Sequence, residues 1–200
     1  MMKLHEKLKD YRLILASQSP RRRELLKGLG LSFEVKTFPG GDESYPFSLK
    51  KEKIALFLAR KKASYFMEKE KLDEKDIVIT ADTIVWINGK ELGKPAGKKE
   101  AVEMLTMLSG QRHTVYTGVC LTSAVKQDAF FSETHVFFRH LSPEEINFYV
   151  KTFAPYDKAG AYGAQEWIGY IAIERIEGSY FNVMGLPVDK LWNALEKFIH

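Results

Sequence analysis

Cysteine is almost absent from this sequence of 200 residues, whose single cysteine, Cys120, lies in the apolar run VYTGVCL. One thiol cannot form a disulfide within the chain, and it cannot build a metal cluster. Disulfide-stabilised scaffolds and cysteine-ligated clusters are therefore excluded. Since free cysteine is among the residue types most often buried, we expect Cys120 to be a core thiol in a strand.

Long hydrophobic runs are missing as well. No stretch approaches the roughly 20 apolar residues that a membrane-spanning helix needs. The N-terminal sequence MMKLHEKLKD is charged and lacks the apolar segment of a secretion signal. From these two absences we expect a cytoplasmic protein with no membrane association.

Three common catalytic signatures are also absent. Neither the GxxxxGK[ST] spacing of a Walker phosphate loop nor the GxSxG nucleophile elbow occurs. The five histidines show no HExxH or other metal-binding spacing, so we interpret them, including His113, as structural residues. A Ser-His-Asp hydrolase and a histidine-ligated metalloenzyme therefore have no support in the sequence.

Apolar residues are plentiful, because 45% of the chain is hydrophobic and 12% is aromatic. This is enough for one compact domain with a core, or for two small lobes. The net charge of +4 fits a small anionic ligand or weak nucleic-acid contact, and it requires neither. Much of the charge is alternating lysine and glutamate, which is typical of solvated helix faces.

The hydrophobic pattern predicts alternating strands and helices. We expect strands at 11–17, 31–40, 77–79, 113–123 and 129–140, and strand with turns over 169–187. We expect helices at 20–28, 49–69, 98–110, 142–151 and 187–198, the fourth opened by a capping box at 142–145. Asn88-Gly89 is a strong hairpin signal. Hairpins mixed with strand–helix units predict one α/β domain over residues 1–200, with a mixed twisted sheet and flanking helices.

An unusual concentration of arginine opens the first predicted helix. Ser19 is a good N-cap and Pro20 suits the first helical position. Acidic residues are favoured in the turn that follows, but the sequence there is Arg21, Arg22 and Arg23. These side chains either point into solvent or form an anion site together with the helix N-terminus, because guanidinium groups bind phosphate oxygens well. The Ser17 and Ser19 hydroxyls would add to such a site.

A single acidic residue, Asp82, lies where the predicted buried strand at 77–79 ends, between Ala81 and Thr83. It is either a magnesium ligand, a general base for water, or an aspartate that starts a turn. Twelve residues later, Lys94 follows the predicted hairpin. The hairpin could return Lys94 to the same end as Asp82, where both would be near one phosphate.

Lys62 interrupts the apolar stripe of the helix predicted at 49–69, four residues from both Leu58 and Phe66. Either its stem is buried while the ammonium reaches water, or the ammonium points into a polar cleft. Glu43, in the preceding loop, is a candidate metal ligand or ion-pair partner. Nothing in its local sequence distinguishes it from other surface acids.

Three stretches of the sequence together resemble the Maf family of nucleoside triphosphate pyrophosphatases. They are LASQSPRRRELL, ITADTIV with LGKP, and KAGAYGAQ with GSYFNVMGLP, in the order that the family has them. The resemblance implies hydrolysis of a nucleoside triphosphate to the monophosphate and pyrophosphate, with Mg²⁺ as the expected divalent metal. It also implies an α/β fold with two lobes around a deep cleft, and a homodimer.

The resemblance also implies roles for acidic residues. Asp82 of the ADT motif corresponds to the catalytic base and to a metal ligand. Glu43 corresponds to a metal-binding acid in the loop before the second helix. The sequence FPGGDE is less regular there than the family pattern.

The basic and polar residues of the motifs correspond to the substrate-binding set. For the phosphates these are Ser17, Arg21, Arg22, Lys62 and Lys94. Arg22, Thr83 and Gln165 match the subgroup that acts on dTTP and UTP, and Thr83 and Gln165 would read the edge of a pyrimidine. Two alternatives stay open, a pyrophosphatase for a modified purine such as 7-methyl-GTP and a non-catalytic binder of nucleotide or nucleic acid in cell-division control. We expect no nucleic-acid partner, because aromatic and basic residues are not interleaved in a recognisable order.

Overall fold

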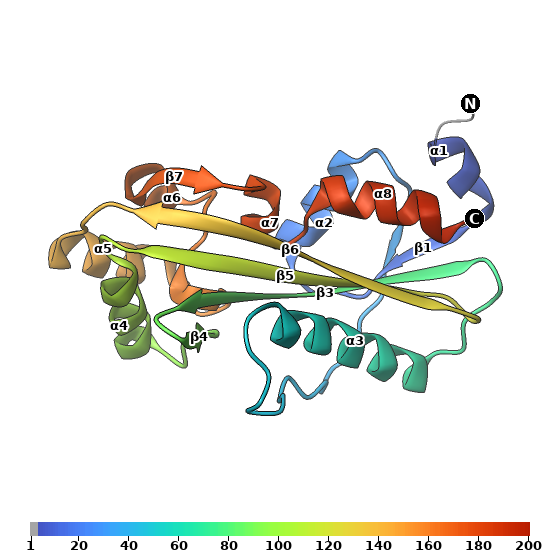
Figure 1. Cartoon of the computed structure of the whole chain (residues 1–200), viewed down its shortest axis with the longest axis horizontal. Coiled ribbons are helices and arrows are strands. Elements are labelled where there is room, and N and C mark those ends of the chain that lie inside the picture. Colours follow the sequence, from blue (N-terminus) through green and yellow to red (C-terminus); the bar gives the residue numbers. More distant parts are fainter. Residues whose placement is uncertain (1–3) are drawn as a thin grey trace. The chain divides into compact units, whose positions relative to one another are not determined.

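The computed structural model describes residues 4–200, and helices alternate with strands along them (Figure 1). The strands are β1 (Arg12–Leu15), β2 (Glu34–Val35), β3 (Asp76–Ile87), β4 (Lys90–Leu92), β5 (Arg112–Thr122), β6 (Gln127–Phe138) and β7 (Ile173–Glu177). The α-helices are α1 (Leu4–Lys7), α2 (Pro20–Gly28), α3 (Glu52–Lys69), α4 (Lys98–Leu108), α5 (Pro143–Phe153), α6 (Trp167–Ala172), α7 (Tyr180–Met184) and α8 (Val188–Phe198). Two short 3-10 helices are η1 (Leu8–Asp10) and η2 (Ala159–Ala161).

The strands described within residues 4–200 form one sheet of mixed direction, as predicted. Its order is β2-β1-β3-β5-β6-β7, and β4 pairs with β3 outside this path. β1 is parallel to both β2 and β3, whereas the β3–β4 and β6–β7 pairs are antiparallel. No helix in the described part of the chain is both long and apolar enough to span a membrane.

The chain divides into two compact units, each built from separate segments. Unit 1 contains the described residues up to Asp82, together with Thr117–Ser132 and Gly185–His200. Unit 2 contains Thr83–Tyr116 and Glu133–Met184. β3, β5 and β6 each contribute one part to unit 1 and the other part to unit 2. A single domain over 1–200 and a deep cleft between two lobes stay predictions.

Unit 1 places α3 on one face of its strands and α2 and α8 on the other (Figure 1). Part of its core consists of Ala59 and Ala63 of α3 packed against Cys120 of β5. Cys120 is the buried strand thiol that the sequence predicts, and burial raises its pKa. Gly118 of β5 lies so close to the backbone of Ala55 in α3 that a Cβ atom there would clash with it. Small residues therefore bring α3 close to the sheet.

The start of α2 has the predicted capping chemistry. The Ser19 hydroxyl accepts a hydrogen bond from the Arg22 backbone N–H at 3.4 Å, and Pro20 occupies the first helical position. This bond satisfies one of the backbone donors that a helix start leaves unpaired.

Unit 2 has one continuous apolar core, to which β3, β5, β6 and helices α4, α5 and α6 contribute. The hairpin between β3 and β4 turns at Asn88 and Gly89, whose φ angles of 50° and 77° suit the predicted tight turn. Helix α4 packs against α5 and η2. The hairpin and the segment around η2 are thus both anchored on this core.

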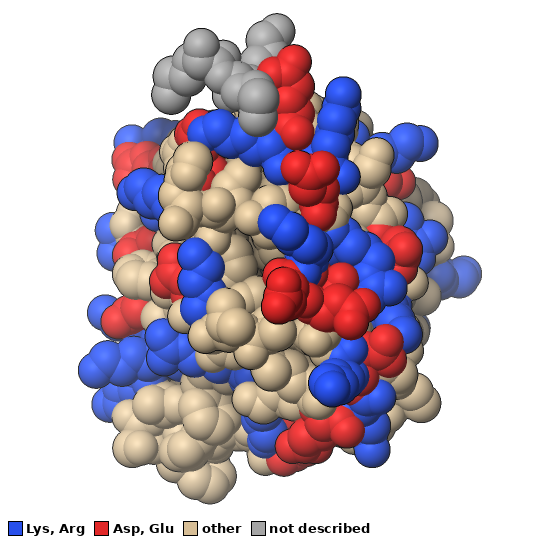
Figure 2. All heavy atoms as spheres, turned by 90° about the vertical axis from the view of Figure 1, so that its right-hand side faces the viewer, with Lys and Arg blue, Asp and Glu red and all other residues tan. Residues whose placement is uncertain are grey.

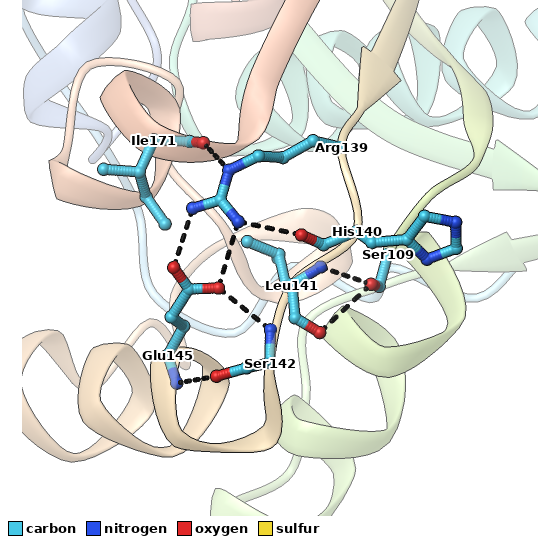
Figure 3. Close-up of polar contacts among 7 residues, drawn as sticks. All are labelled: Ser109, Arg139, His140, Leu141, Ser142, Glu145 and Ile171. Carbon is cyan, nitrogen blue, oxygen red and sulfur yellow. Dashed lines mark hydrogen bonds and ion pairs between the residues drawn. The ribbon is translucent and has the colours of Figure 1, made fainter.

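The predicted capping box at the start of α5 is present (Figure 3). The Ser142 hydroxyl accepts from the Glu145 backbone N–H at 3.3 Å, and the Glu145 carboxylate accepts from the Ser142 backbone N–H at 2.9 Å. Arg139 donates to both oxygens of that carboxylate, at 2.7 and 3.1 Å, and to the Ile171 carbonyl. The bidentate pair holds the pKa of Glu145 below its ordinary value and ties the end of β6 to α5 and α6.

Three predicted elements differ from the structure. Only Glu34–Val35 of the strand predicted at 31–40 is a strand. The strand predicted at 77–79 extends to Ile87, so β3 does not end at Asp82. Helices α6 and α7 occupy part of the region expected to be strand and turns. In α6, Gly169 approaches the Ala164 carbonyl more closely than a side chain would allow. The β-forming preference of Trp, Ile and Tyr in WIGYIA is thus overridden in the folded chain.

Charged side chains of both signs are interspersed over the face shown in Figure 2. The mixture is the arrangement expected of solvated faces with alternating lysine and glutamate. Lys61 and Asp42 are one such surface pair, with 2.6 Å between Nζ and Oδ2.

His113 in the core of unit 2 gives a pH-dependent prediction. It is 1% exposed, and its Nε2 lies 2.8 Å from the Tyr162 hydroxyl. Burial lowers the pKa of His113 to about 3. The unfolded chain, with an ordinary pKa of about 6.5, therefore binds a proton that the folded chain excludes. The stabilising contribution is complete above pH ~6.5 and is lost as the pH falls toward 3, at about 1.4 kcal/mol per pH unit.

We expect His113→Gln to reduce this slope by about 1.4 kcal/mol per pH unit, because glutamine does not titrate. Urea unfolding of both proteins between pH 4 and 6.5 measures the difference, and the carboxylates common to both proteins cancel. Identical slopes would show that His113 accepts a proton without unfolding.

Candidate functional site

Asp82 lies in the interior of β3, not at its end, so the alternative that it starts a turn is wrong. It is 8% exposed. Thr80, two residues earlier on the same strand face, donates to the Ala59 carbonyl of α3 at 2.8 Å. Lys62, three residues along α3 from Ala59, donates to Asp82 Oδ1 at 2.5 Å. The packing of β3 on α3 therefore places the buried Asp82 carboxylate beside Lys62.

The ammonium of Lys62 joins two acidic residues that are distant in sequence. Besides Asp82, its Nζ contacts Glu43 Oε1 at 2.8 Å. The Lys62 side chain is 27% exposed and its stem lies on the apolar stripe of α3. The ammonium is therefore paired with carboxylates and also partly exposed, and a polar cleft around Lys62 stays a prediction.

The loop that contains Glu43 is held on α3 by its neighbours. Lys61 donates to Asp42 Oδ2 at 2.6 Å and to the Ser44 carbonyl at 2.7 Å. The Tyr65 hydroxyl donates to the Pro39 carbonyl at 2.5 Å. Two adjacent acids thus pair with two adjacent lysines. The Asp42–Lys61 pair was not predicted, although the adjacent DE and KK residues stand in the sequence.

Arg22 joins the start of α2 to other parts of unit 1. Its Nε donates to the Gly185 carbonyl at 2.8 Å, and its Nη1 donates to the Ser17 hydroxyl at 3.3 Å. Ser17 is buried and also accepts from the Ser19 backbone N–H. Burial lowers the pKa of Arg22, and the Asp82 and Glu43 carboxylates oppose this shift. Arg22 therefore belongs electrostatically with the two acids. Its contact with Gly185 had no signal in the sequence.

The three arginines of the motif differ in exposure. Arg21 and Arg22 are half-buried, whereas Arg23 is exposed. The solvated alternative therefore holds for Arg23. We call Ser17, Arg22, Glu43, Lys62 and Asp82 the unit 1 cluster.

The unit 1 cluster contains a donor set that fits Mg²⁺. The Asp82 carboxylate of β3 and the Glu43 carboxylate of the loop before α3 both contact the Lys62 ammonium. Mg²⁺ in nucleotide enzymes is held by one or two carboxylates together with phosphate oxygens and water. Within residues 4–200, no group of three or more His, Cys, Asp and Glu side chains is placed to hold a metal ion.

The other three predicted site residues, Thr83, Lys94 and Gln165, belong to unit 2. In the antiparallel β3–β4 pair, Val85 faces Leu92. Extending this register by two residues brings Lys94 level with Thr83, so the hairpin returns Lys94 toward the start of the unit 2 part of β3. Lys94 is exposed.

Gln165 lies in the segment between η2 and α6. Its side-chain Oε1 is buried and has no hydrogen-bond partner within the described residues 4–200. Buried acceptors are nearly always paired, so this oxygen lacks the donor that a folded chain normally supplies.

The family model described as Maf-like protein matches residues 12–198. The chain belongs to the Maf family. Two Maf relatives are named dTTP/UTP pyrophosphatase. The protein from Phocaeicola vulgatus is 53% identical over 96% of this chain and 98% of its own. The protein from Flavobacterium johnsoniae is 44% identical over 98% of this chain and 100% of its own.

Among solved structures, a HAM1 protein from Coxiella burnetii aligns with 94% of this Maf chain and 99% of its own chain. Its sequence identity is 16% and the TM-score is 0.49. The Maf resemblance of the sequence motifs is thus confirmed by the family match.

Proposed function

We propose that this Maf protein hydrolyses dTTP and UTP to the nucleoside monophosphate and pyrophosphate. The observation that carries the proposal is the contact of Lys62 with both Asp82 and Glu43. This contact brings together a buried carboxylate of β3, an acid of the loop before α3 and a lysine of α3, all in unit 1. The names of the relatives support the choice of substrate.

Asp82 is the group that accepts the proton of the attacking water. The water oxygen forms a bond to the α-phosphorus, the bond from that phosphorus to the bridging oxygen of the β-phosphate breaks, and pyrophosphate leaves with the electron pair. A positioned carboxylate accelerates such a proton transfer by about 10²–10⁴-fold. Lys62 holds Asp82 in place through the 2.5 Å hydrogen bond to Oδ1.

The basic residues stabilise charge on the phosphates, which is the main task in phosphoryl transfer. These residues are Arg21, Arg22, Lys62 and Lys94, together with the Ser17 hydroxyl.

We propose Asp82 and Glu43 as the residues that hold Mg²⁺. When bound, Mg²⁺ would neutralise phosphate charge and polarise the phosphorus centre. Removal of divalent ions with EDTA is expected to abolish turnover, and added Mg²⁺ to restore it.

Gln165, with Thr83 and Arg22, is proposed to select the base. The free acceptor Oε1 of Gln165 suits the ring N–H of thymine or uracil, while its amide N–H₂ suits a ring carbonyl.

We further propose a homodimer and a cytoplasmic location, where nucleoside triphosphates are available. Sedimentation equilibrium tests the dimer.

The test of the function is product analysis with dTTP, UTP, GTP and 7-methyl-GTP in Mg²⁺ and ¹⁸O-labelled water. We expect dTTP and UTP to react at least tenfold faster than the two purine nucleotides. The products should be monophosphate and pyrophosphate, with the label in the monophosphate, because water attacks the α-phosphorus. Label in the pyrophosphate would reject Asp82-assisted attack at that atom. Turnover of 7-methyl-GTP alone, or nucleic-acid binding without any turnover, would favour one of the two alternatives.

A further inference from the structure

A buried lysine, Lys158, lies in unit 2 outside the residues assigned above. It is 8% exposed. Its Nζ contacts Asp157 Oδ1 at 2.7 Å and Glu166 Oε1 at 3.0 Å. Lysine is almost never fully buried unless it is paired. The Lys158–Glu166 ion pair joins the two ends of residues 158–166, the segment that contains Gln165.

A second bond secures the middle of the same segment. The Tyr149 hydroxyl donates to Glu166 Oε2, and it accepts from the Gly163 backbone N–H at 3.1 Å. Tyr149 belongs to α5 and is fully buried in the core of unit 2. Burial and the Glu166 carboxylate raise the pKa of Tyr149, so its hydroxyl remains a donor at physiological pH. Glu166 therefore accepts from two groups at once, one on each carboxylate oxygen.

Close packing fixes the backbone on both sides of Gln165. A Cβ atom on Gly163 would lie 2.8 Å from the Glu166 carboxyl carbon. A Cβ atom on Gly169 would clash with the Ala164 carbonyl. The backbone is thus closely packed on both sides of Gln165, whose Oε1 has no hydrogen-bond partner within residues 4–200.

The start of the segment also contacts the hairpin arm that contains Lys94. Gly160 has a φ of 68°, and its N–H donates to the Gly93 carbonyl at 3.0 Å. A Cβ atom on Gly160 would lie 3.0 Å from Val85 of β3. The segment is therefore tied to the backbone immediately before Lys94, as well as to α5.

We propose that Lys158 is a positioning residue, which sets base discrimination by holding Glu166 and thereby the backbone that presents Gln165. This inference rests on the proposed function, in which Gln165 reads the base. Lys158 and Glu166 do not contact substrate in this account. They determine where the Gln165 amide points.

The test is Lys158→Met, which keeps the length of the stem and leaves Glu166 without its cation. We expect KM for dTTP to rise about tenfold while kcat stays within about twofold, because binding is lost equally in the ground state and the transition state. The dTTP-to-dGTP ratio of kcat/KM should fall by a similar factor. Lys158→Arg, which keeps the charge, should retain the wild-type ratio. Lys158→Met/Glu166→Gln should recover part of the ratio, since no buried charge is left unpaired.

A double-mutant cycle with Gln165→Met shows whether Lys158 acts through Gln165. If it does, Lys158→Met has no further effect on the dTTP-to-dGTP ratio in the Gln165→Met background. Additive effects would overturn the proposal. So would a Lys158→Met protein with reduced kcat and an unchanged ratio, because that is the result of a general structural defect. Tyr149→Phe removes one hydroxyl and is the milder variant if Lys158→Met does not fold. It should shift the ratio in the same direction.

Arg139→Met is the matched control, because it breaks another ion pair of unit 2, with Glu145 at 2.7 Å. It should lower the melting temperature and leave KM and the base ratio unchanged. Hydrogen exchange should become faster in residues 158–166 only in Lys158→Met.

Binding of an α,β-imido analogue of dUTP separates the proposal for Lys158 from the proposed function. Wild-type protein that binds the analogue but turns over no dTTP would reject the proposed function. Loss of binding in Lys158→Met would still support the role of Lys158 in positioning Gln165.

Discussion

Asp82→Asn is expected to lower kcat for dTTP by about a thousandfold, with KM changed less than tenfold. The asparagine has nearly the shape of aspartate, but it cannot accept the proton of the attacking water. General-base catalysis is worth about 10²–10⁴-fold, so the loss should fall within this range. Steady-state kinetics with release of pyrophosphate as the readout measures it. Circular dichroism and thermal unfolding show whether the fold is retained.

The matched control is Asp42→Asn. Asp42 also pairs with a lysine of α3, at 2.6 Å from Lys61, but it is exposed and lies outside the unit 1 cluster. Its substitution should change kcat less than fivefold. An Asp82→Asn protein that keeps more than a tenth of the wild-type kcat would remove Asp82 from the role of general base.

Lys62→Met is expected to lower kcat/KM by about a hundredfold or more. The change deletes a cation that contacts both Asp82 and Glu43, and it leaves two carboxylates facing the negative charge of a triphosphate. Loss of one preorganised charge-stabilising group typically costs about 10²–10³-fold. Because Asp82 also loses its partner in a buried position, we expect the melting temperature to fall as well.

Lys61→Met is the control for Lys62→Met, because the two lysines are neighbours on α3 and each pairs with an acid of the same loop. It should change kcat/KM less than fivefold. Isothermal titration of the α,β-imido analogue separates binding from chemistry in both variants. Equal losses in Lys61→Met and Lys62→Met would show that the effect comes from the net charge of the helix and not from the contacts of Lys62.

Local chemistry explains which parts of the fold could be predicted. The Ser19 N-cap, the Asn88-Gly89 turn and the capping box at 142–145 each depend on bonds within a few residues, and all three are present. The buried strand position of Asp82 depends instead on Lys62, an ion-pair partner twenty residues earlier in another element. A polar residue that follows an apolar run indicates a turn when only that run is considered. For this reason the strand predicted at 77–79 ended too early, whereas β3 continues to Ile87.

In the candidate site, too, the residue types could be predicted from local motifs. Their grouping could not, because Lys62 contacts Asp82 and Glu43 across distant parts of the sequence. Arg22, which contacts Ser17, is joined to the two acids by electrostatic attraction. Lys158 and Glu166 were missed because the segment between them is rich in glycine and alanine and has no period. They are partners in the folded chain, where Glu166 also accepts from Tyr149 of α5.

The discontinuous composition of unit 1 has a consequence for how the protein folds during synthesis. Unit 1 includes Gly185–His200, which a ribosome adds only after all of unit 2 has been made. The Gly185 carbonyl is the acceptor for Arg22 Nε, so the start of α2 cannot reach its final arrangement earlier. Pairing between such distant segments is slow compared with the formation of local structure. A nascent chain that already contains Asp82 and Lys62 should therefore lack the Arg22–Gly185 bond until the last segment of unit 1 has docked.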